Sequence, residues 1–260
     1  MELKDKLALV CGSTQGIGYA TAELMASRGA TIILLARNEV KLKEVRDTLP
    51  TPVGQEHSYL VADFSIPGEL KSVISEYVGS GNVIDILVNN TGGPKGGPII
   101  DADISEFTSA FQQHLIGNHI LVQAVFPGMK EKGWGRIVNV ISTSVKQPLD
   151  GLGVSNTVRG AVANWSKTMA NELGQFNITV NNVLPGATNT IRLQSIAEAK
   201  SAKTQEDVSA ILEGMAKQSP MKRIADPTEV AEAIAFLASD RASYINGINV
   251  PVDGGRTKSL

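Results

Sequence analysis

The sequence predicts an α/β protein built on a doubly wound, parallel sheet of about seven strands. Seven short runs of β-branched residues and leucine are apolar almost throughout, which is typical of strands buried on both faces of a parallel sheet. Between them, apolar residues recur at helical spacing, so strands and helices alternate and right-handed crossovers follow. The 260 residues contain no repeat, low-complexity block or linker, so we expect residues 1–260 to form a single domain.

The predicted strands are rich in Val, Ile and Leu and are short. In chain order they are Leu7–Val10, Thr31–Leu35, Tyr59–Ala62, Ile84–Val88, Arg136–Ile141, Thr179–Leu184 and Ile248–Val252.

The predicted helices have one apolar face each. The first carries Ile17, Ala20 and Leu24, two long helices span about residues 105–132 and 155–174, and the last has Asp226 and Pro227 at its start. A capping residue followed by the preset φ of proline is typical of a helix start. Residues 187–219 are polar and rich in Ala, Lys and Glu, and we expect a small helical lid there, the alternative being a plain surface excursion.

Composition excludes several classes of protein. The formal net charge is −2, which offers no basic surface for nucleic acid or an anionic membrane. The single cysteine, Cys11, excludes an intramolecular disulfide, and no Cys/His spacing suggests a metal site. Neither a signal peptide nor a membrane-length apolar stretch is visible. We therefore expect a cytoplasmic protein whose partner is a small molecule.

A glycine-rich turn follows the first predicted strand directly. Gly12, Gly16 and Gly18 allow a sharp turn, a close approach to a pyrophosphate and tight packing of helix on strand. The following helix offers free N–H groups and a positive dipole end to phosphates. Such turns are common, so the position after the first strand carries the prediction of a Rossmann-type dinucleotide site. The cofactor contacts expected in this loop are Gly12, Ser13, Gln15, Gly16, Ile17 and Gly18.

The end of the second predicted strand indicates which dinucleotide binds. An NAD site usually has an acidic residue there for the ribose 2′-hydroxyl, and this chain has Arg37 and Asn38 instead. Arg37 is suited to pairing with a 2′-phosphate, which favours NADP(H) over NAD(H). The alternative is a solvated surface arginine.

Further motifs resemble those of the short-chain dehydrogenase/reductase family over about residues 4–255. Within the family the chain looks most similar to the 3-oxoacyl-acyl-carrier-protein-reductase-like branch. The matching segments are Asn89-Asn90-Thr91-Gly92, Gly135–Ser142, Pro185-Gly186 with Thr190, Pro220–Ala231 and Gly247–Gly255.

The resemblance implies an oxidoreductase acting on a small carbonyl or alcohol. In the family a tyrosine donates a proton, a lysine four residues later lowers its pKa and holds the ribose, a serine binds the substrate oxygen, and an asparagine anchors a relay water. Relatives commonly form homo-oligomers, tetramers or dimers, through the two long helices and the last strand. The resemblance also implies cofactor contacts from Asp63, Phe64, Asn89, Thr91, Gly92, Pro185, Gly186 and Thr190.

Three of the four catalytic positions depart from the family. Ser142 is kept, but Ser155 replaces the tyrosine, Arg159 the lysine and His114 the asparagine. An aliphatic hydroxyl is far less acidic than a phenol, so Ser155 is a poor general acid. Arg159 keeps a positive charge and is expected to contact the ribose, yet guanidinium cannot shuttle a proton. His114 suggests a relay through Ser155, because imidazole titrates near neutrality.

Each substitution also has a plain structural explanation. His114 would then be a satisfied core histidine, Ser155 the N-cap of a helix running from Val158, and Arg159 a surface residue in a salt bridge. Two functions follow. One is an NADP(H)-dependent reductase of a ketone or 3-oxoacyl-type substrate with an altered proton donor. The other is a cofactor-binding sensor or partner subunit with little or no hydride transfer.

Overall fold

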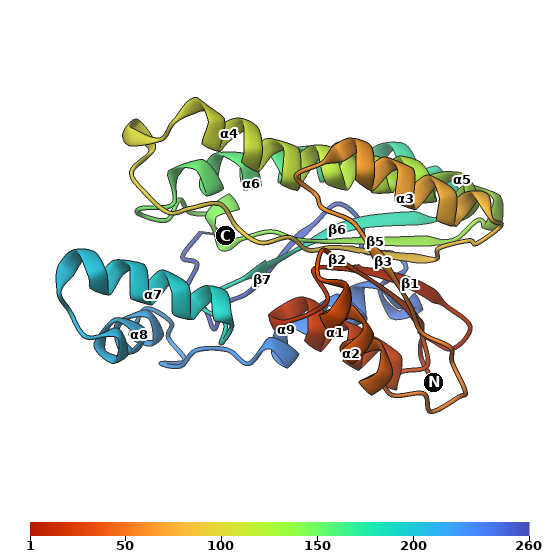
Figure 1. Ribbon diagram of the computed structural model, residues 1–260, viewed down its shortest axis with the longest axis horizontal. Helices are drawn as coiled ribbons and strands as arrows, with labels where there is room; N and C mark the ends of the chain where they lie inside the picture. Colours follow the sequence, from red (N-terminus) through yellow and green to blue (C-terminus); the bar gives the residue numbers. More distant parts are fainter. Residues whose placement is uncertain (260) are drawn as a thin grey trace.

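The computed structural model describes residues 1–259 and contains one seven-stranded sheet between two layers of helices (Figure 1). The strand order is β3-β2-β1-β4-β5-β6-β7, and every neighbouring pair is parallel. All seven predicted strands are confirmed, with ends within two residues of those expected. They are β1 Leu7–Cys11, β2 Thr31–Ala36, β3 Ser58–Val61, β4 Ile86–Asn89, β5 Gly135–Val140, β6 Ile178–Pro185 and β7 Asn249–Val252.

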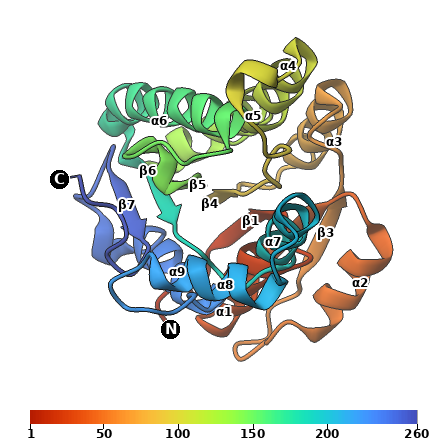
Figure 2. The same cartoon turned by 90° about the vertical axis from the view of Figure 1, so that its left-hand side faces the viewer.

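The helices cover both faces of the sheet, and Figure 2 shows the two layers from the end (Figure 2). On one side lie α1 Gly16–Ser27, α2 Glu39–Thr48 and α9 Pro227–Leu237. On the other lie α3 Pro67–Gly79, α4 Ile104–Phe111, α5 Gly117–Lys132 and α6 Gly153–Leu173. Short 3-10 turns occupy Ile99–Asp101, Thr143–Val145, Gly174–Phe176 and Asp240–Ala242.

Each face of the sheet has its own apolar core, as the continuous apolar strands predict. Val10 and Leu34 pack with Ile234 of α9 on one face, whereas Leu87 packs with Leu121 of α5 on the other. The doubly wound sheet is therefore buried on both sides. No helix within residues 1–259 is both long enough and apolar enough to span a membrane.

The start of α9 follows the sequence prediction. The Asp226 side chain accepts from the backbone N–H of Thr228, Glu229 bonds back to the Asp226 N–H, and Pro227 is the first helical residue. This capping box satisfies N–H groups that would otherwise lack partners.

One predicted helix is interrupted. The chain is helical from Ile104 to Lys132, but a π-helical turn at Gln112–Ile116 separates α4 from α5. This turn contains His114, whose side chain is buried. Apolar spacing alone does not reveal a local change from i→i+4 to i→i+5 bonding, and such turns are frequent at functional sites.

Residues 187–219 contain two helices, α7 Ile191–Thr204 and α8 Val208–Lys217. In Figure 1 they project at the left of the molecule, apart from α4 and α6 on the opposite side (Figure 1). Thr190 caps α7 and Asp207 caps α8, each accepting from a backbone N–H of the first turn.

An asparagine ladder crosses the sheet from β4 to β7. Asn89, Asn139, Asn182 and Asn249 lie opposite one another in register, and each donates its side-chain amide to, or accepts from, the next at 2.8–3.0 Å. Asn139 also donates to Ser166 of α6 at 2.9 Å. The ladder therefore ties four strands to the helix that carries Ser155 and Arg159.

Candidate active site

The predicted site residues meet at the carboxyl end of the sheet. The crossover after β1 leads to one face and the one after β4 leads to the other, so these neighbouring strands mark the topological switch point of the sheet. In open α/β sheets, ligands bind beyond the carboxyl ends of the strands at such a point. The loops after β1, β4, β5 and β6 all end there.

The glycine loop is too tight for side chains. Gly12 and Gly16 have φ of +59° and +56°, in the left-handed region that glycine adopts without strain. A Cβ on Gly18 would lie 2.1 Å from the carbonyl oxygen of Gly12. Asn90 donates its amide to the carbonyl oxygen of Cys11 at 3.2 Å and so holds the loop. Sequence reasoning assigned Asn90 no role, although it stands in the motif after β4.

The loop fits a dinucleotide pyrophosphate. Gln15, at the N-cap of α1, is extended and makes no side-chain capping bond, so the first N–H groups of the helix remain for a ligand. Ile17 lies in the first turn of that helix and packs on the core. Ser13 is fully buried and accepts from the Leu35 N–H at 3.1 Å, which supports the loop from beneath. A Cβ on Gly16 would lie 3.0 Å from the Thr190 methyl group, so the loop after β6 faces the glycine loop.

The end of β2 places Arg37 beside Asp63. The exposed Arg37 guanidinium lies 3.6 Å from the Asp63 carboxylate. Burial disfavours ionisation of Asp63, but hydrogen bonds from Ser65 and the charge of Arg37 hold its pKa below the usual value. Asn38 accepts from the Lys41 N–H and caps α2.

The other predicted cofactor residues line the loops after β3, β4 and β6. Phe64 is buried and packs against Gly117, where a Cβ would lie 2.6 Å from its ring. Gly92 has open space around it, as a ligand requires. Pro185 ends β6, and Gly186 passes so close to Asp253 that a Cβ would lie 2.8 Å from its Cα. Asn89 anchors the asparagine ladder, and Thr190 accepts from the Leu193 N–H at the start of α7.

Two serine hydroxyls lie at the ends of β5 and α6. Ser142 follows β5, is half-buried and accepts from the Ser144 N–H at 3.1 Å. Ser155 is half-buried in the first turn of α6, which begins at Gly153 after Leu152. The N-cap interpretation of Ser155 is therefore wrong, because the helix begins earlier than the apolar spacing indicated. Its hydroxyl makes no hydrogen bond within residues 1–259.

Arg159 is a buried cation without a carboxylate partner. Its side chain is 7% exposed, and it donates to the carbonyl oxygens of Val140 at 3.1 Å and Thr91 at 3.4 Å. No Asp or Glu in the described part of the chain pairs with it, so the interpretation as a surface salt bridge is wrong. Burial, together with the positive charge of Arg192, lowers the pKa of Arg159 to about 10, and the group stays charged at neutral pH.

His114 is buried and hydrogen-bonded through one nitrogen only. Its Nδ1 pairs with the Thr91 hydroxyl, whereas its Nε2 has no partner within residues 1–259. Burial and the charge of Arg159 lower its pKa to about 2, so the ring is neutral near pH 7. The interpretation of His114 as a satisfied core histidine is confirmed in that the ring is buried and Nδ1 is hydrogen-bonded. It is not confirmed for Nε2, which lacks a partner. A relay would have to pass through the neutral ring.

Sequence reasoning missed Arg192. It extends from the first turn of α7 and donates through Nη2 to the carbonyl oxygen of Pro94, in the loop after β4. In the sequence it is one cation in a polar segment, and only the fold brings it to this loop. Residues 1–259 contain no cluster of His, Cys, Asp or Glu that could hold a metal ion.

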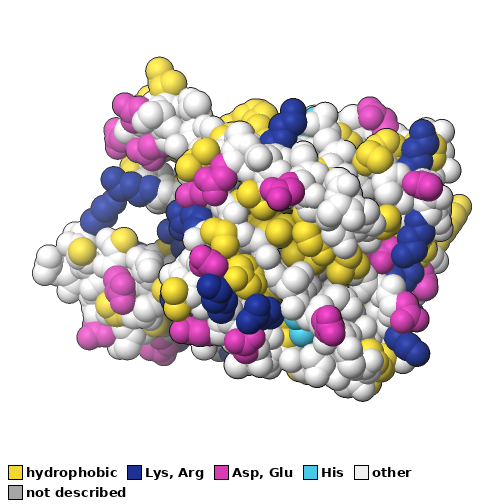
Figure 3. All heavy atoms as spheres, turned by 45° about the vertical axis from the view of Figure 1, so that its right-hand side comes forward, with side chains coloured by type: hydrophobic (Ala, Val, Ile, Leu, Met, Phe, Trp, Pro, Cys, Tyr) yellow, Lys and Arg dark blue, Asp and Glu magenta, His cyan; other side chains and the backbone are white. Residues whose placement is uncertain are grey.

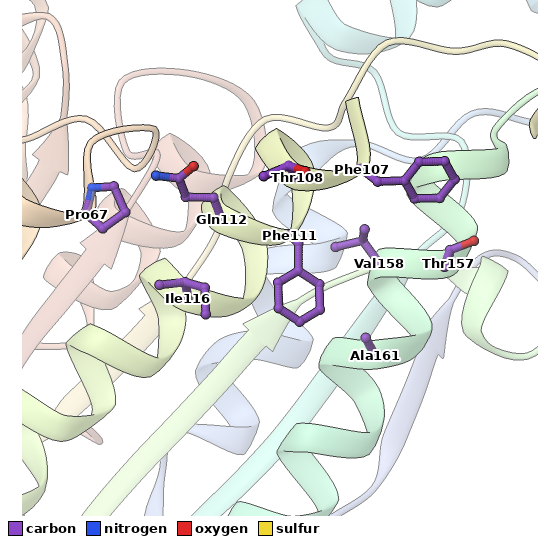
Figure 4. A pocket seen from close by; sticks show the side chains of 9 residues that line it. All are labelled: Pro67, Phe107, Thr108, Phe111, Gln112, Ile116, Thr157, Val158 and Ala161. Atoms are coloured by element: carbon purple, nitrogen blue, oxygen red, sulfur yellow. The ribbon is translucent and has the colours of Figure 1, made fainter. Parts of the chain in front are cut away.

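An apolar cavity of about 590 Å³ lies outside the site, on the outer side of α4 and α6 (Figure 4). Figure 4 shows the Phe111 ring in the space between the helices. The cavity contains none of the predicted site residues. Its lining is Pro67, Phe107, Thr108, Phe111, Gln112, Ile116, Thr157, Val158 and Ala161.

The strand order and the glycine loop at the switch point define a Rossmann-type dinucleotide-binding protein. A family model described as enoyl-(acyl carrier protein) reductase matches residues 12–257. The chain belongs to the short-chain dehydrogenase/reductase family of oxidoreductases.

Similar proteins cover nearly the whole chain. The 3-oxoacyl-[acyl-carrier-protein] reductase FabG of Vibrio cholerae is 32% identical over 257 residues, 98% of each chain. Oxidoreductase UcpA of Escherichia coli K12 is 34% identical, over 98% of this chain and 96% of its own. Among solved structures, L-sorbose reductase from Gluconobacter frateurii, complexed with NADPH and L-sorbose, has a TM-score of 0.93 at 32% identity and covers 100% of this chain and 99% of its own.

Proposed function

We propose that the chain is an NADP(H)-dependent oxidoreductase that reduces a ketone or 3-oxoacyl-type carbonyl of a small molecule. The observation that carries this proposal is the arrangement of Arg159, Ser155 and Ser142. The buried, charged guanidinium of Arg159 lies one helical turn from Ser155, whose hydroxyl makes no hydrogen bond within residues 1–259. It also donates to the carbonyl oxygen of Val140 in β5, two residues before Ser142. Such a set can bind a carbonyl oxygen and stabilise negative charge on it.

The preference for NADP(H) is supported by the end of β2. It offers Arg37 where an NAD site usually has a carboxylate. Two similar proteins, L-sorbose reductase and the actinorhodin polyketide ketoreductase, were solved with NADPH. The glycine loop and the start of α1 would hold the pyrophosphate, Arg37 the 2′-phosphate, and Pro185, Gly186 and Thr190 the nicotinamide. When bound, the cofactor supplies the hydride.

Within the chain, the substrate oxygen receives hydrogen bonds from Ser142 and Ser155. As the carbonyl carbon accepts hydride, negative charge builds on that oxygen, and the fixed charge of the buried Arg159 stabilises it. The proton that completes the alcohol comes from water by way of the Ser155 hydroxyl. Because that hydroxyl is weakly acidic, its proton moves only once the oxygen carries nearly full negative charge.

The second candidate is a cofactor-binding sensor or partner subunit with little hydride transfer. The absence of tyrosine at Ser155 favours it, because neither a serine nor an arginine replaces the usual proton donor well. In this alternative the glycine loop keeps its binding role.

The test combines binding and turnover. Titration with NADPH and, separately, NADH, followed by nicotinamide fluorescence, should give NADPH a Kd lower by about tenfold or more. NADPH oxidation should be measured with a panel of ketones and 3-oxoacyl thioesters. Arg159→Met should lower kcat by a factor on the order of 100–1,000, the usual effect of removing one stabilising donor. Arg241→Met, which removes an exposed arginine from another part of the surface, serves as the control.

Binding of NADPH without oxidation by any carbonyl would favour the second candidate. In that case, Ser155→Tyr combined with Arg159→Lys should create activity where there was none. If neither nucleotide binds, both candidates are wrong.

A further inference from the structure

Two guanidinium groups approach the loop after β4 from opposite sides. Arg159 donates to the carbonyl oxygen of Thr91 from α6, and Arg192 donates to that of Pro94 from α7. Between these contacts lie only Gly92 and Gly93, which bring no side chains. A Cβ on Gly93 would lie 3.5 Å from Arg192 Nη2, so this guanidinium rests directly on the loop.

Neither arginine has an anionic partner. No Asp or Glu of the described residues forms an ion pair with either of them. The hydrogen-bond partners of both are backbone carbonyls, which accept hydrogen bonds but do not neutralise charge. The two cations sense each other, since the charge of Arg192 is one cause of the lowered pKa of Arg159. The charge of Arg159 is buried without a counter-charge, which is costly, and the nearby charge of the exposed Arg192 adds to that cost.

The remaining N–H groups provide a site for an oxyanion. Each guanidinium has five N–H donors in a planar fork, and the backbone bonds use two on Arg159 and one on Arg192. Guanidinium forks match carboxylate and phosphate oxygens in geometry. Figure 3 shows Lys and Arg side chains at the opening between the α7–α8 segment and the helices opposite (Figure 3). An anion would therefore meet positive charge as it enters.

The anion can come from the cofactor or from the substrate. The pyrophosphate already has the glycine loop and the uncapped start of α1. Arg159, in contrast, lies one turn from Ser155, next to the position proposed for the reacting carbonyl. We propose that Arg159 and Arg192 together bind a carboxylate on the substrate, so that the chain acts on oxo acids and the corresponding hydroxy acids. This inference rests on the proposed function and names its substrate class.

Matched substrates test the proposal directly. NADPH oxidation is measured with 2-oxo, 3-oxo and 4-oxo acids of four to six carbons and with the methyl ester of each, which keeps the carbonyl and removes the charge. The preferred acid should exceed its ester in kcat/KM by about tenfold or more. In Arg192→Met, that acid-to-ester ratio should fall several-fold, because one of the two charges that distinguish the acid from the ester is removed while Arg159 remains.

The control is Lys200→Met, which removes a positive charge from an exposed position on the same helix. It should keep the acid-to-ester ratio of the unmodified protein. Two results would overturn the proposal. One is equal turnover of acids and esters by the unmodified protein. The other is an Arg192→Met protein whose ratio is unchanged and whose affinity for NADPH is lower, which would assign Arg192 to the cofactor pyrophosphate.

Direct binding separates this inference from the proposed function. Calorimetric titration of the NADP⁺-loaded protein with malonate should show binding that weakens with salt and is about tenfold weaker in Arg192→Met, whereas uncharged malonamide should not bind. Malonate binding without turnover of any carbonyl would leave the carboxylate site standing and refute the reductase. Turnover of neutral ketones without malonate binding would support the reductase and refute the carboxylate site.

Discussion

Three departures from the family motifs meet at Thr91. Its hydroxyl pairs with His114 and its carbonyl oxygen accepts from Arg159. The family has alanine in place of Thr91, asparagine in place of His114 and lysine in place of Arg159. The Thr91 hydroxyl thus gives His114 a hydrogen-bond partner, and the guanidinium of Arg159 donates to the carbonyl oxygen of the same threonine. The three substituted residues therefore form one hydrogen-bonded group in the candidate site.

The neutral, buried His114 should make stability depend on pH. The unfolded chain takes up a proton at this ring near pH 6.5, whereas the folded protein holds its pKa at about 2. Below about pH 6.5 the unfolded state therefore binds more protons, and the free energy of unfolding falls with pH. Between about pH 7.5 and 5.5 this ring should account for a loss of about 1.4 kcal/mol.

Urea denaturation of the unmodified protein and of His114→Asn at these pH values measures that loss. The carboxylates of both proteins are the same, so their contribution cancels in the comparison. The variant should lose less stability on acidification by the amount stated. Parallel curves would mean that the folded protein binds a proton at His114 as readily as the unfolded chain does.

Sequence reasoning named most residues of the candidate site but not the contacts between them. Gly12, Gly16 and Gly18 follow from what a turn near a phosphate requires, and the structure gives two of them positive φ. The environment of Arg159 could not be predicted, because burial depends on strands distant in sequence. Arg192 could not be recognised at all, since its partner, Pro94, lies 98 residues away. Local spacing carries no signal for such contacts.

At the scale of elements, the asparagine ladder connects the sheet to α6, the helix that carries Ser155 and Arg159. Four side chains that would be isolated polar groups in an apolar sheet hydrogen-bond to one another across β4, β5, β6 and β7, although the side-chain oxygen of Asn89 has no partner within residues 1–259. Asn139 is the central member, fully buried, and has three partners. Through Asn139, the ladder connects Asn89, at the end of β4, to Ser166 of α6. It therefore fixes the position of α6 relative to the loop that contains Thr91.

Replacing Asn139 by leucine, which has the same branching and number of side-chain heavy atoms but is larger and cannot hydrogen-bond, should destabilise the protein by about 2–5 kcal/mol. The substitution leaves the amide of Asn89, the hydroxyl of Ser166 and the oxygen of Asn182 buried without these bonds, and each unsatisfied group costs about 1–3 kcal/mol before relaxation. Urea denaturation measures the loss. Asn249→Leu, at the half-buried end of the ladder, is the control and should cost less. An equal loss of stability in both variants would mean that the energetic contribution of a ladder residue does not depend on how deeply it is buried.

At the scale of the whole molecule, the apolar pattern of the sequence was sufficient to predict the sheet. It was not sufficient to predict the interruption of one helix. Runs such as Arg136–Ile141 can only be strands buried on both faces, and β5 is buried along its whole length. The π-helical turn at Gln112–Ile116 leaves the apolar spacing almost unchanged. His114 in this turn pairs with the Thr91 hydroxyl, a contact with a residue 23 positions away that local spacing does not reveal.

The outer face of α4 and α6 is where we expect the chain to associate with a second copy. The resemblance implies a homo-oligomer formed through the two long helices predicted at about residues 105–132 and 155–174, which include α4 and α6, and the apolar cavity of about 590 Å³ lies on this face. Phe111 is 42% exposed there and Ile116 is 37% exposed, an apolar surface that water solvates poorly. A symmetric pair of copies would cover the same surface on both chains.

Light scattering coupled to size-exclusion chromatography should show a dimer or tetramer, and Phe111→Lys should shift it towards the monomer. A lysine there would bring two positive charges close together across a symmetric interface, and burying them without partners is unfavourable. Val40→Lys, on exposed α2, is the matched control because it adds the same charge to an exposed apolar position away from this face. A monomeric unmodified protein, or an equal shift in both variants, would show that the α4–α6 face does not form the interface.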